Sequence, residues 1–239
     1  MALPKLGIPY FSTKLISGKE VKFRPFLVKE EKALLMASES RDSSLIVNTI
    51  KNTIKSCVSS ETSIDFDTIP LFELEWLILN IRMKSVGETS KFKIKCEKCE
   101  KMNPYDLNLN EINIENKEAA KETKIMLTPT VGVTLQQTPY KILESIDILN
   151  IEKEDEKKLF IDNVIECIVN VFDENQVYTK KDFEKNELVE FIDNLTQSQF
   201  IELGKHLENP PKLNYKIEKT CENCGHENIK ILSGISDFF

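Results

Sequence analysis

The sequence is poor in the residues that most catalytic and nucleotide-binding motifs need. Its 239 residues include only seven glycines and two histidines. The glycines are not spaced as in GxGxxG or Walker-type phosphate loops. His206 and His226 lie outside any HExxH or H-x-E pattern, and the serines form no nucleophile elbow. We therefore expect a protein that is not an enzyme and that has no small-molecule substrate.

Long apolar runs are lacking as well. The longest candidate, residues 71–81, contains Glu73, Glu75 and Asn80 and is shorter than the ~20 residues of a membrane-spanning helix. The first residues show no apolar core of a secretory signal. We therefore expect no membrane contact and a reducing cytoplasm, in which cysteines stay free for other chemistry.

An excess of positive charge is also lacking, since 39 Asp and Glu outnumber 32 Lys and Arg and the formal net charge is −7. An acidic chain is a poor general binder of nucleic acid, because affinity for the phosphate backbone comes from clustered lysine and arginine. One stretch departs from this balance, and its lysines are Lys91, Lys93, Lys95, Lys98 and Lys101. We interpret it as a solvated strand face and expect no nucleic-acid partner. A zinc-ribbon module that binds nucleic acid or regulates through these lysines stays open as the alternative.

The chain does contain two CxxC pairs, Cys96/Cys99 and Cys221/Cys224. Each lies between segments of alternating apolar and polar residues, a pattern typical of a zinc knuckle at the tip of a β-hairpin. Two knuckles supply four thiolates, the full tetrahedral set of a structural zinc site. We therefore predict one shared structural Zn²⁺ as the cofactor.

Three alternatives to this shared site remain. Residues 100–220 separate the pairs, far more than the about 15–20 residues usual in such motifs. The first alternative is a redox site, but a redox CxxC would open a helix, whereas turn and strand residues follow each pair here. Disulfides are the second alternative. The third is that His226, close to Cys224, replaces one thiolate, although we expect four cysteines to suffice.

Apolar periodicity and turn residues predict a mixed order of elements. Residues 10–26 should form a hairpin, with helices at 28–39, from Asp42 or Ser43 to Cys57, and at 70–84. The last of these is apolar almost all the way round, so it should be buried on several sides. Strands are expected at 91–96, 104–109, 112–114, 123–128 and 131–135, helices at 139–149, 154–172, 182–195 and from 196 to before Pro210, and strands again from Leu213.

We therefore predict an α+β protein with three parts. Residues 1–87 form a helical N-terminal part with the hairpin. Residues 88–136 and 210–239 form a discontinuous, zinc-ribbon-like β module built from the two knuckles. Residues 137–209 form an inserted helical subdomain. Cys57 and Cys167 are expected to be buried thiols on helical stripes.

Four stretches, taken in order, carry a family resemblance: residues 1–6, 22–32, 80–88 and 232–239. They read MALPKL, KFRPFLVKEEK, NIRMKSVGE and LSGISDFF. In these words and in its layout, the chain resembles the baseplate hub proteins of T4-like bacteriophages.

The resemblance implies a non-enzymatic structural or assembly protein of a contractile tail, acting at the central hub of the baseplate. It implies contacts with other baseplate and hub proteins, in the host cytoplasm during assembly and in the tail baseplate of the virion. It assigns no catalytic residues. Phe238 and Phe239 either pack into the chain's own core or contact a partner, and both alternatives stay open.

Overall fold

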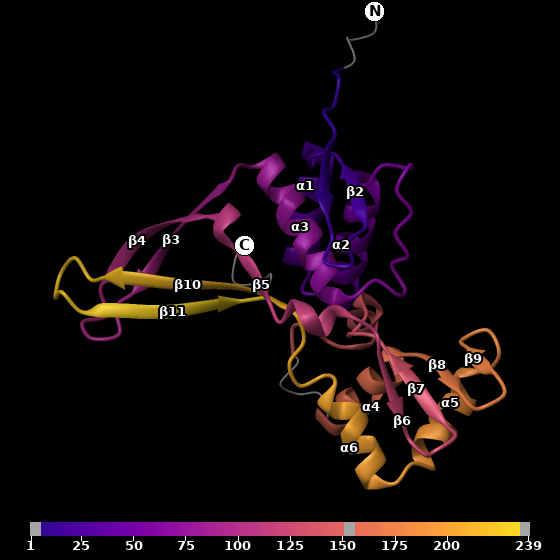
Figure 1. Ribbon diagram of the computed structural model, residues 1–239. Coiled ribbons are helices and arrows are strands. Elements are labelled where there is room, and N and C mark those ends of the chain that lie inside the picture. Colours follow the sequence, from indigo (N-terminus) through magenta and orange to yellow (C-terminus); the bar gives the residue numbers. More distant parts are fainter. Residues whose placement is uncertain (1–5, 151–155, 235–239) are drawn as a thin grey trace, which may run out of the picture.

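The computed structural model describes residues 6–150 and 156–234, and three clusters of buried apolar residues lie among its elements (Figure 1). The N-terminal unit contains β1 (Phe11–Lys14), β2 (Glu20–Phe23), α1 (Val28–Ser40), α2 (Ser43–Cys57) and α3 (Leu71–Ser85). The arm contains β3 (Thr89–Lys95), β4 (Met102–Asn108), η1 (Leu109–Glu111), β5 (Asn113–Glu115), β10 (Lys212–Thr220) and β11 (Glu227–Ser233). The β6–α6 unit contains η2 (Lys117–Ala120), β6 (Thr123–Met126), β7 (Gly132–Leu135), η3 (Tyr140–Ser145), α4 (Glu156–Cys167), β8 (Ile168–Phe172), β9 (Val177–Thr179), α5 (Lys185–Asp193) and α6 (Gln197–Lys205).

The N-terminal unit packs a two-stranded hairpin against three helices. β1 pairs antiparallel with β2, and Gly18 adopts a φ of 89° in the turn between them. Asp42 is the N-cap of α2, and its side chain accepts a hydrogen bond from the Leu45 amide at 3.0 Å. The predicted hairpin and the predicted start of the second helix are confirmed.

Helix α3 joins the N-terminal unit to the arm. Leu74 and Leu77 belong to the core of the N-terminal unit, whereas Leu79 and Met83 belong to the core of the arm. Trp76 packs against both cores. The prediction that this helix is buried on several sides is confirmed, and its double burial fixes the base of the arm.

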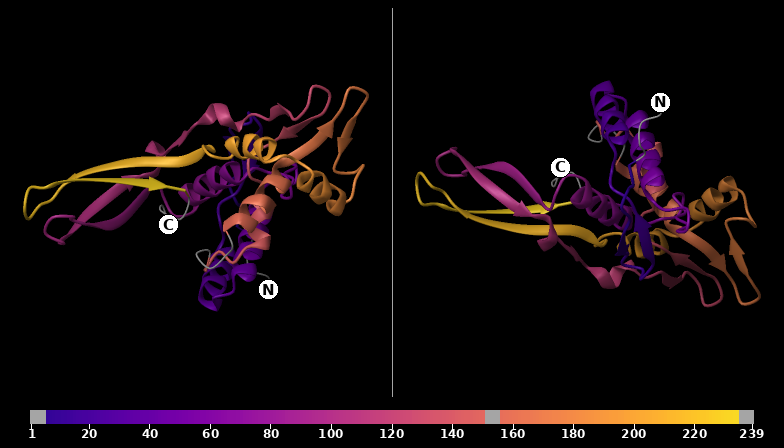
Figure 2. Two further views of the ribbon diagram at one scale, coloured as in Figure 1. Left: turned by 90° about the horizontal axis from the view of Figure 1, so that it is seen from below. Right: turned by 90° about the horizontal axis from the view of Figure 1, so that it is seen from above.

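The arm consists of two long hairpins that face each other and extend away from the rest of the molecule (Figures 1 and 2). β3 pairs with β4, while β10 pairs with β11 on one side and with β5 on the other. The buried residues between the hairpins and α3 are Leu79, Met83, Ile94, Leu107, Leu109, Ile112, Ile114, Leu213, Ile217 and Leu232. Apolar packing along the hairpins therefore brings their tips, at residues 96–101 and 221–226, to the same end of the arm.

The β6–α6 unit corrects one predicted helix. Residues 154–172 were expected to be helical throughout, but α4 ends at Cys167 and Ile168–Phe172 is strand β8. β8 lies between β7 and β9 in a sheet of order β6-β7-β8-β9. The segment is rich in β-branched residues (Ile168, Val169 and Val171), which favour a strand, and β7 supplies its backbone partners. Its apolar residues fit the period of a helix as well as that of a strand, so the apolar pattern alone led to the wrong prediction of a helix.

The predicted helix at 139–149 is also shorter than expected. Only η3, a short 3-10 helix, forms there. Beyond it, the Asp147 carboxylate accepts hydrogen bonds from the Leu149 amide at 3.1 Å and from the Asn150 side chain at 2.9 Å. Such bonds from the chain to an aspartate side chain compete with helical ones. In η3 itself, the Tyr140 hydroxyl donates to the Val47 carbonyl at 2.7 Å and so ties this segment to α2.

The sheet of the β6–α6 unit crosses the predicted division of the chain. Residues 88–136 were expected to belong to the metal-bearing module and 137–209 to a helical insertion, yet β7 pairs with β8 across that boundary. The observed fold is mixed helix and sheet, with several small sheets. The three-part division itself stays a proposal. Phe238 and Phe239 lie outside the described residues.

Candidate metal centre

The two CxxC turns have the same backbone construction. In the first, the Cys96 amide donates to the Lys101 carbonyl at 2.9 Å and the Glu100 amide donates to the Cys96 carbonyl at 2.9 Å. In the second, the corresponding bonds run from Cys221 to the His226 carbonyl at 2.8 Å and from Gly225 to the Cys221 carbonyl at 3.0 Å. The two turns are therefore equivalent in their backbone hydrogen bonds.

Equivalent positions also share an unusual backbone conformation. Glu100 has a φ of 59° and Gly225 a φ of 69°, both in the left-handed region. Glycine adopts this region freely, whereas another residue loses ~1–2 kcal/mol there. Glu100 adopts this conformation because its amide is bonded to the Cys96 carbonyl within the turn. The hydrogen bonds of the turn therefore outweigh the local cost.

The four cysteine sulfurs converge at the tip of the arm. Cys96 Sγ lies 3.7 Å from Cys224 Sγ, and Cys99 Sγ lies 3.6 Å from Cys221 Sγ. All four sulfurs lie within 4.8 Å of one another. A tetrahedral site with metal–sulfur bonds of about 2.3 Å requires sulfurs about 3.8 Å apart. The donor set and its spacing therefore fit a four-coordinate metal ion, and the structure places all four predicted residues in this one cluster.

The thiols of the cluster differ in acidity. Backbone N–H groups of Asn223 and Cys224 lower the pKa of Cys221 to about 6. For Cys224, the hydrogen bond from the His226 amide lowers the pKa, but burial and the neighbouring thiols outweigh it and raise the pKa to about 12. Four thiolates this close repel one another, so full ionisation requires a cation among them.

Two buried asparagines connect the turns across the arm. Asn103, on β4, accepts a hydrogen bond from the Glu222 amide at 3.0 Å and directs its Nδ2 at Cys221 Sγ, 3.5 Å away. Asn228, on β11, accepts a hydrogen bond from the Glu97 amide at 2.9 Å. Each asparagine thus binds the residue that follows the first cysteine of the opposite pair. Side chains of this kind orient metal ligands and hold the two halves of a site in register.

These asparagines were missed in the sequence, although a signal was present. Asn103 follows Cys96, and Asn228 follows Cys221, by the same seven positions. Asn103 and Asn228 are 2% and 4% exposed, which is rare for an amide without full hydrogen bonding. A repeated offset from each cysteine pair is therefore a usable mark of the residues that support such a centre.

The other candidates lie outside the cluster of sulfurs. His226 contributes its main-chain carbonyl, which accepts from Cys221 and from the Asn228 side chain at 3.1 Å. Within residues 6–150 and 156–234, the group of possible ligands at the tip contains the four cysteines and no histidine. Cys57 and Cys167 are fully buried elsewhere, as predicted, and burial raises the pKa of Cys167 to about 12.

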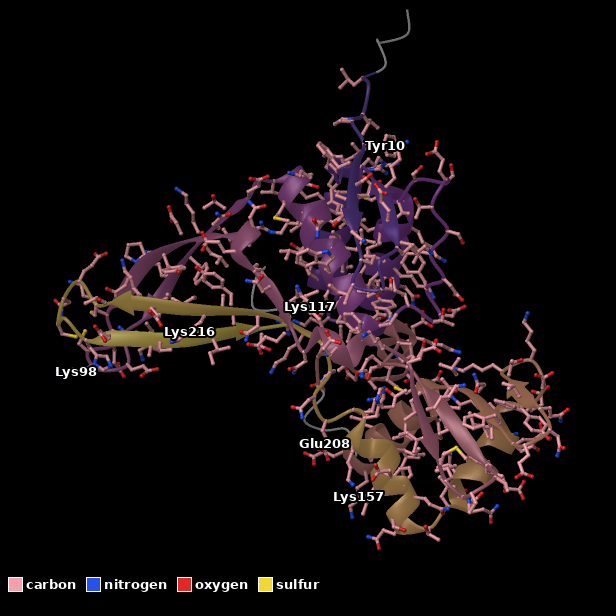
Figure 3. All side chains as sticks on the ribbon, in the orientation of Figure 1. Tyr10, Lys98, Lys117, Lys157, Glu208 and Lys216 are labelled. Carbon is pink, nitrogen blue, oxygen red and sulfur yellow. The ribbon has the colours of Figure 1, made fainter. Side chains whose placement is uncertain are left out.

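The lysine-rich stretch lies on the outside of the arm. Lys91 pairs with Asp106 at 3.6 Å, and Lys95 pairs with Glu100 at 3.2 Å. Lys98 lies at the very tip of the arm (Figure 3). Two of the lysines thus have acidic partners on the same hairpin, which reduces the net positive charge of this face. In the described part of the chain, we found no helix of the length and apolarity that a membrane crossing requires.

Comparison with known proteins gives one match. The family model described as "T4 bacteriophage base plate protein" matches residues 8–239. No curated protein and no solved structure matches the chain significantly. The matched range takes in the N-terminal unit, the arm and the β6–α6 unit, so it covers all four cysteines.

Proposed function

Because this chain belongs to the T4 bacteriophage base plate protein family, we propose that it is a structural or assembly protein of the central hub of a contractile-tailed phage baseplate. The family supports a structural role in the baseplate, and the ordered words in residues 1–6, 22–32, 80–88 and 232–239 support the hub as the place. The protein acts through contacts with other baseplate and hub proteins, without turnover of a substrate. Its sites of action are the host cytoplasm during assembly and the tail baseplate of the virion.

The shape of the molecule supports a role in protein contact. The arm extends from the two units in each view of the molecule (Figure 2). Most residues of β11 are exposed, so this strand is accessible to neighbours. On β11, Ile229 and Ile231 are 55% and 61% exposed on the outer face. Exposed apolar side chains on a projecting element suit a contact with a partner protein.

Within the same proposal, Cys96, Cys99, Cys221 and Cys224 hold one structural zinc ion. Zinc is the metal best suited to four thiolates in tetrahedral geometry. When bound, the ion would offset half of the negative charge of the four thiolates and cross-link the two hairpins of the arm. The chain's own contribution is to present the four sulfurs from two equivalent turns and to lock those turns together through Asn103 and Asn228. The observation that carries this proposal is the convergence of the four sulfurs within 4.8 Å.

The second candidate is a zinc-ribbon module that binds nucleic acid or regulates, and the outward row Lys91, Lys93 and Lys95 favours it. Salt-dependent binding of DNA or RNA would support this candidate, because each phosphate contact releases counterions. The carboxylate partners of Lys91 and Lys95 and the net charge of −7 favour the baseplate role instead.

The test of the baseplate role is a phage that lacks this gene, complemented from a plasmid. We expect tails without complete baseplates in its absence and normal tails with the wild-type copy. Mass spectrometry of purified virions and of complexes pulled down from infected cells then separates a resident component from an assembly factor. Normal tail assembly without the gene would contradict the proposed function.

A further inference from the structure

A separate cleft lies on the β6–α6 unit, far along the chain from the cysteine turns. Two cavities adjoin there, because both are lined by Phe183 and Leu188. The first, of 290 Å³, lies between β8, β9 and α5, and the second, of 190 Å³, lies between α4, α5 and the residues after β9. We call the two together the α5 cleft.

The two ends of the α5 cleft differ in chemistry. The larger cavity is walled mainly by apolar and aromatic side chains, which include Val171, Phe172, Tyr178 and Phe191. Its volume is slightly below the ~300–1,000 Å³ typical of sites for whole small molecules. It is therefore suited to one large side chain of a partner rather than to a cofactor.

The smaller cavity is basic. Its lining includes Lys141, Lys180 and Lys185 together with Glu166. Each lysine lies near an oxygen atom of Glu166. Lys185 Nζ lies 3.1 Å and Lys141 Nζ 3.9 Å from the carboxylate, and Lys180 donates to the main-chain carbonyl at 3.1 Å. Two ammonium groups thus share one carboxylate, and a third lies on the carbonyl of the same residue, in a chain that is acidic as a whole.

The three lysines exceed the one carboxylate in formal charge. Burial is the main cause that lowers the pKa of Lys180, and Glu166, the next largest influence, opposes it and outweighs either neighbouring lysine taken alone. A second carboxylate in the cavity would pair with the positive charge that Glu166 leaves over. The side chains of Lys141 and Lys185 are 48% and 67% exposed, so an incoming group can reach them.

We propose that the α5 cleft binds a protein segment that carries a large apolar or aromatic side chain next to a carboxylate. The apolar side chain enters the larger cavity, and the carboxylate is held by the three lysines. Asp173 and Glu187 also line the larger cavity and would repel a second negative group there. The charges therefore fix the direction of the segment and disfavour a polyanion such as nucleic acid lying along the cleft.

The proposal is tested on the full chain with a fluorescein-labelled peptide, Gly-Ser-Ser-Phe-Asp-Ser-Gly, by fluorescence polarisation at low ionic strength. Two matched peptides replace the Asp by Asn, or the Phe by Ser. We expect each matched peptide to bind about tenfold more weakly than the parent, since each loses one of the two anchors. This experiment needs no phage and no metal, so its outcome is independent of the proposed function.

Matched protein variants locate the binding. Lys141→Gln with Lys185→Gln should weaken binding of the parent peptide about tenfold, because two exposed ion pairs contribute up to about 1 kcal/mol each. Lys121→Gln with Lys205→Gln makes the same charge change at two other exposed lysines of this unit and should leave binding unaltered. Four results would overturn the proposal: no binding, equal loss in both double variants, equal binding of the neutral peptide, or inorganic phosphate binding as tightly as the parent peptide.

Discussion

Asn228→Ala tests whether the buried amides hold the two cysteine turns together. Asn228 is 4% exposed and makes three hydrogen bonds at the tip of the arm. Its Oδ1 accepts from the Glu97 amide at 2.9 Å, and its Nδ2 donates to the carbonyls of Lys219 at 3.2 Å and His226 at 3.1 Å. Alanine removes all three and leaves the Glu97 amide to find another partner, while the His226 carbonyl keeps its bond from the Cys221 amide.

The magnitude follows from these bonds. Each typical hydrogen bond contributes about 1 kcal/mol net, and groups left buried without a partner cost about 1–3 kcal/mol. The tip is partly open to water, which replaces some of the lost bonds. We therefore expect a loss of about 2 kcal/mol in the free energy of metal binding, or roughly thirtyfold in zinc affinity. This lies within the ~10–100-fold range typical of residues that support metal ligands.

A chromophoric chelator that competes for zinc measures the affinity of each variant. Asn103→Ala should lose zinc to a similar degree, because Asn103 occupies the equivalent position on the other hairpin. Asn110→Ala is the control, since Asn110 is an exposed residue of the same arm whose side-chain amide makes two hydrogen bonds of about the same length. Unchanged zinc affinity in both buried variants, or an equal loss in the control, would refute the reasoning.

Three further changes test other parts of the structure. Glu30→Gln breaks the buried pair with Arg24 (2.8 Å) and should lower the free energy of unfolding by about 3 kcal/mol at pH 7. Burial opposes ionisation of Glu30, but hydrogen bonds from Arg24 and the Leu27 amide lower its pKa from 4.5 to about 2. This stabilisation is therefore complete above pH 4.5 and lost as the pH falls toward 2, so urea unfolding at pH 7 and pH 3 should show the variant's deficit shrinking. Cys221→Ser should lower the melting temperature far more than Cys57→Ser, and an equal effect in differential scanning calorimetry would argue against a cross-linking role for Cys221. Gly132→Ala places a methyl group 2.8 Å from a carbonyl of β6 and against an aromatic ring of β8, so it should cost about 1–3 kcal/mol in urea unfolding, and a neutral result would contradict the packing of this sheet.

Much of the local structure could be predicted from the sequence because local residues determine it. The hairpin at residues 11–23 and the three helices after it carry their own turn, cap and periodicity signals. The cysteine turns also carry local signals, since a hydrogen bond between residues five positions apart closes each turn. The meeting of the two turns was a hypothesis from chemistry, because four thiolates complete one tetrahedral site. The structure places them together through apolar packing of the hairpins, which a reading of local pattern does not capture.

The errors lie where the partner of a segment decides its conformation. Ile168–Phe172 is apolar at helical spacing, yet β7 offers it an edge and the segment becomes a strand. The short η3 follows from the bonds of Asp147, one of which reaches Ser43 on α2. The role of Asn103 and Asn228 is likewise visible only when the opposite hairpin is in place. In each case the deciding contact comes from a residue distant in the sequence.

The most direct test of the account is native mass spectrometry of the full chain, purified under reducing conditions without added metal. The account predicts one zinc ion per chain, lost when Cys96 and Cys221 are both replaced by serine. It also predicts that removal of the ion by a chelator lowers the melting temperature of the wild-type protein. Stoichiometrically metal-free protein, with a melting temperature that zinc does not change, would contradict it.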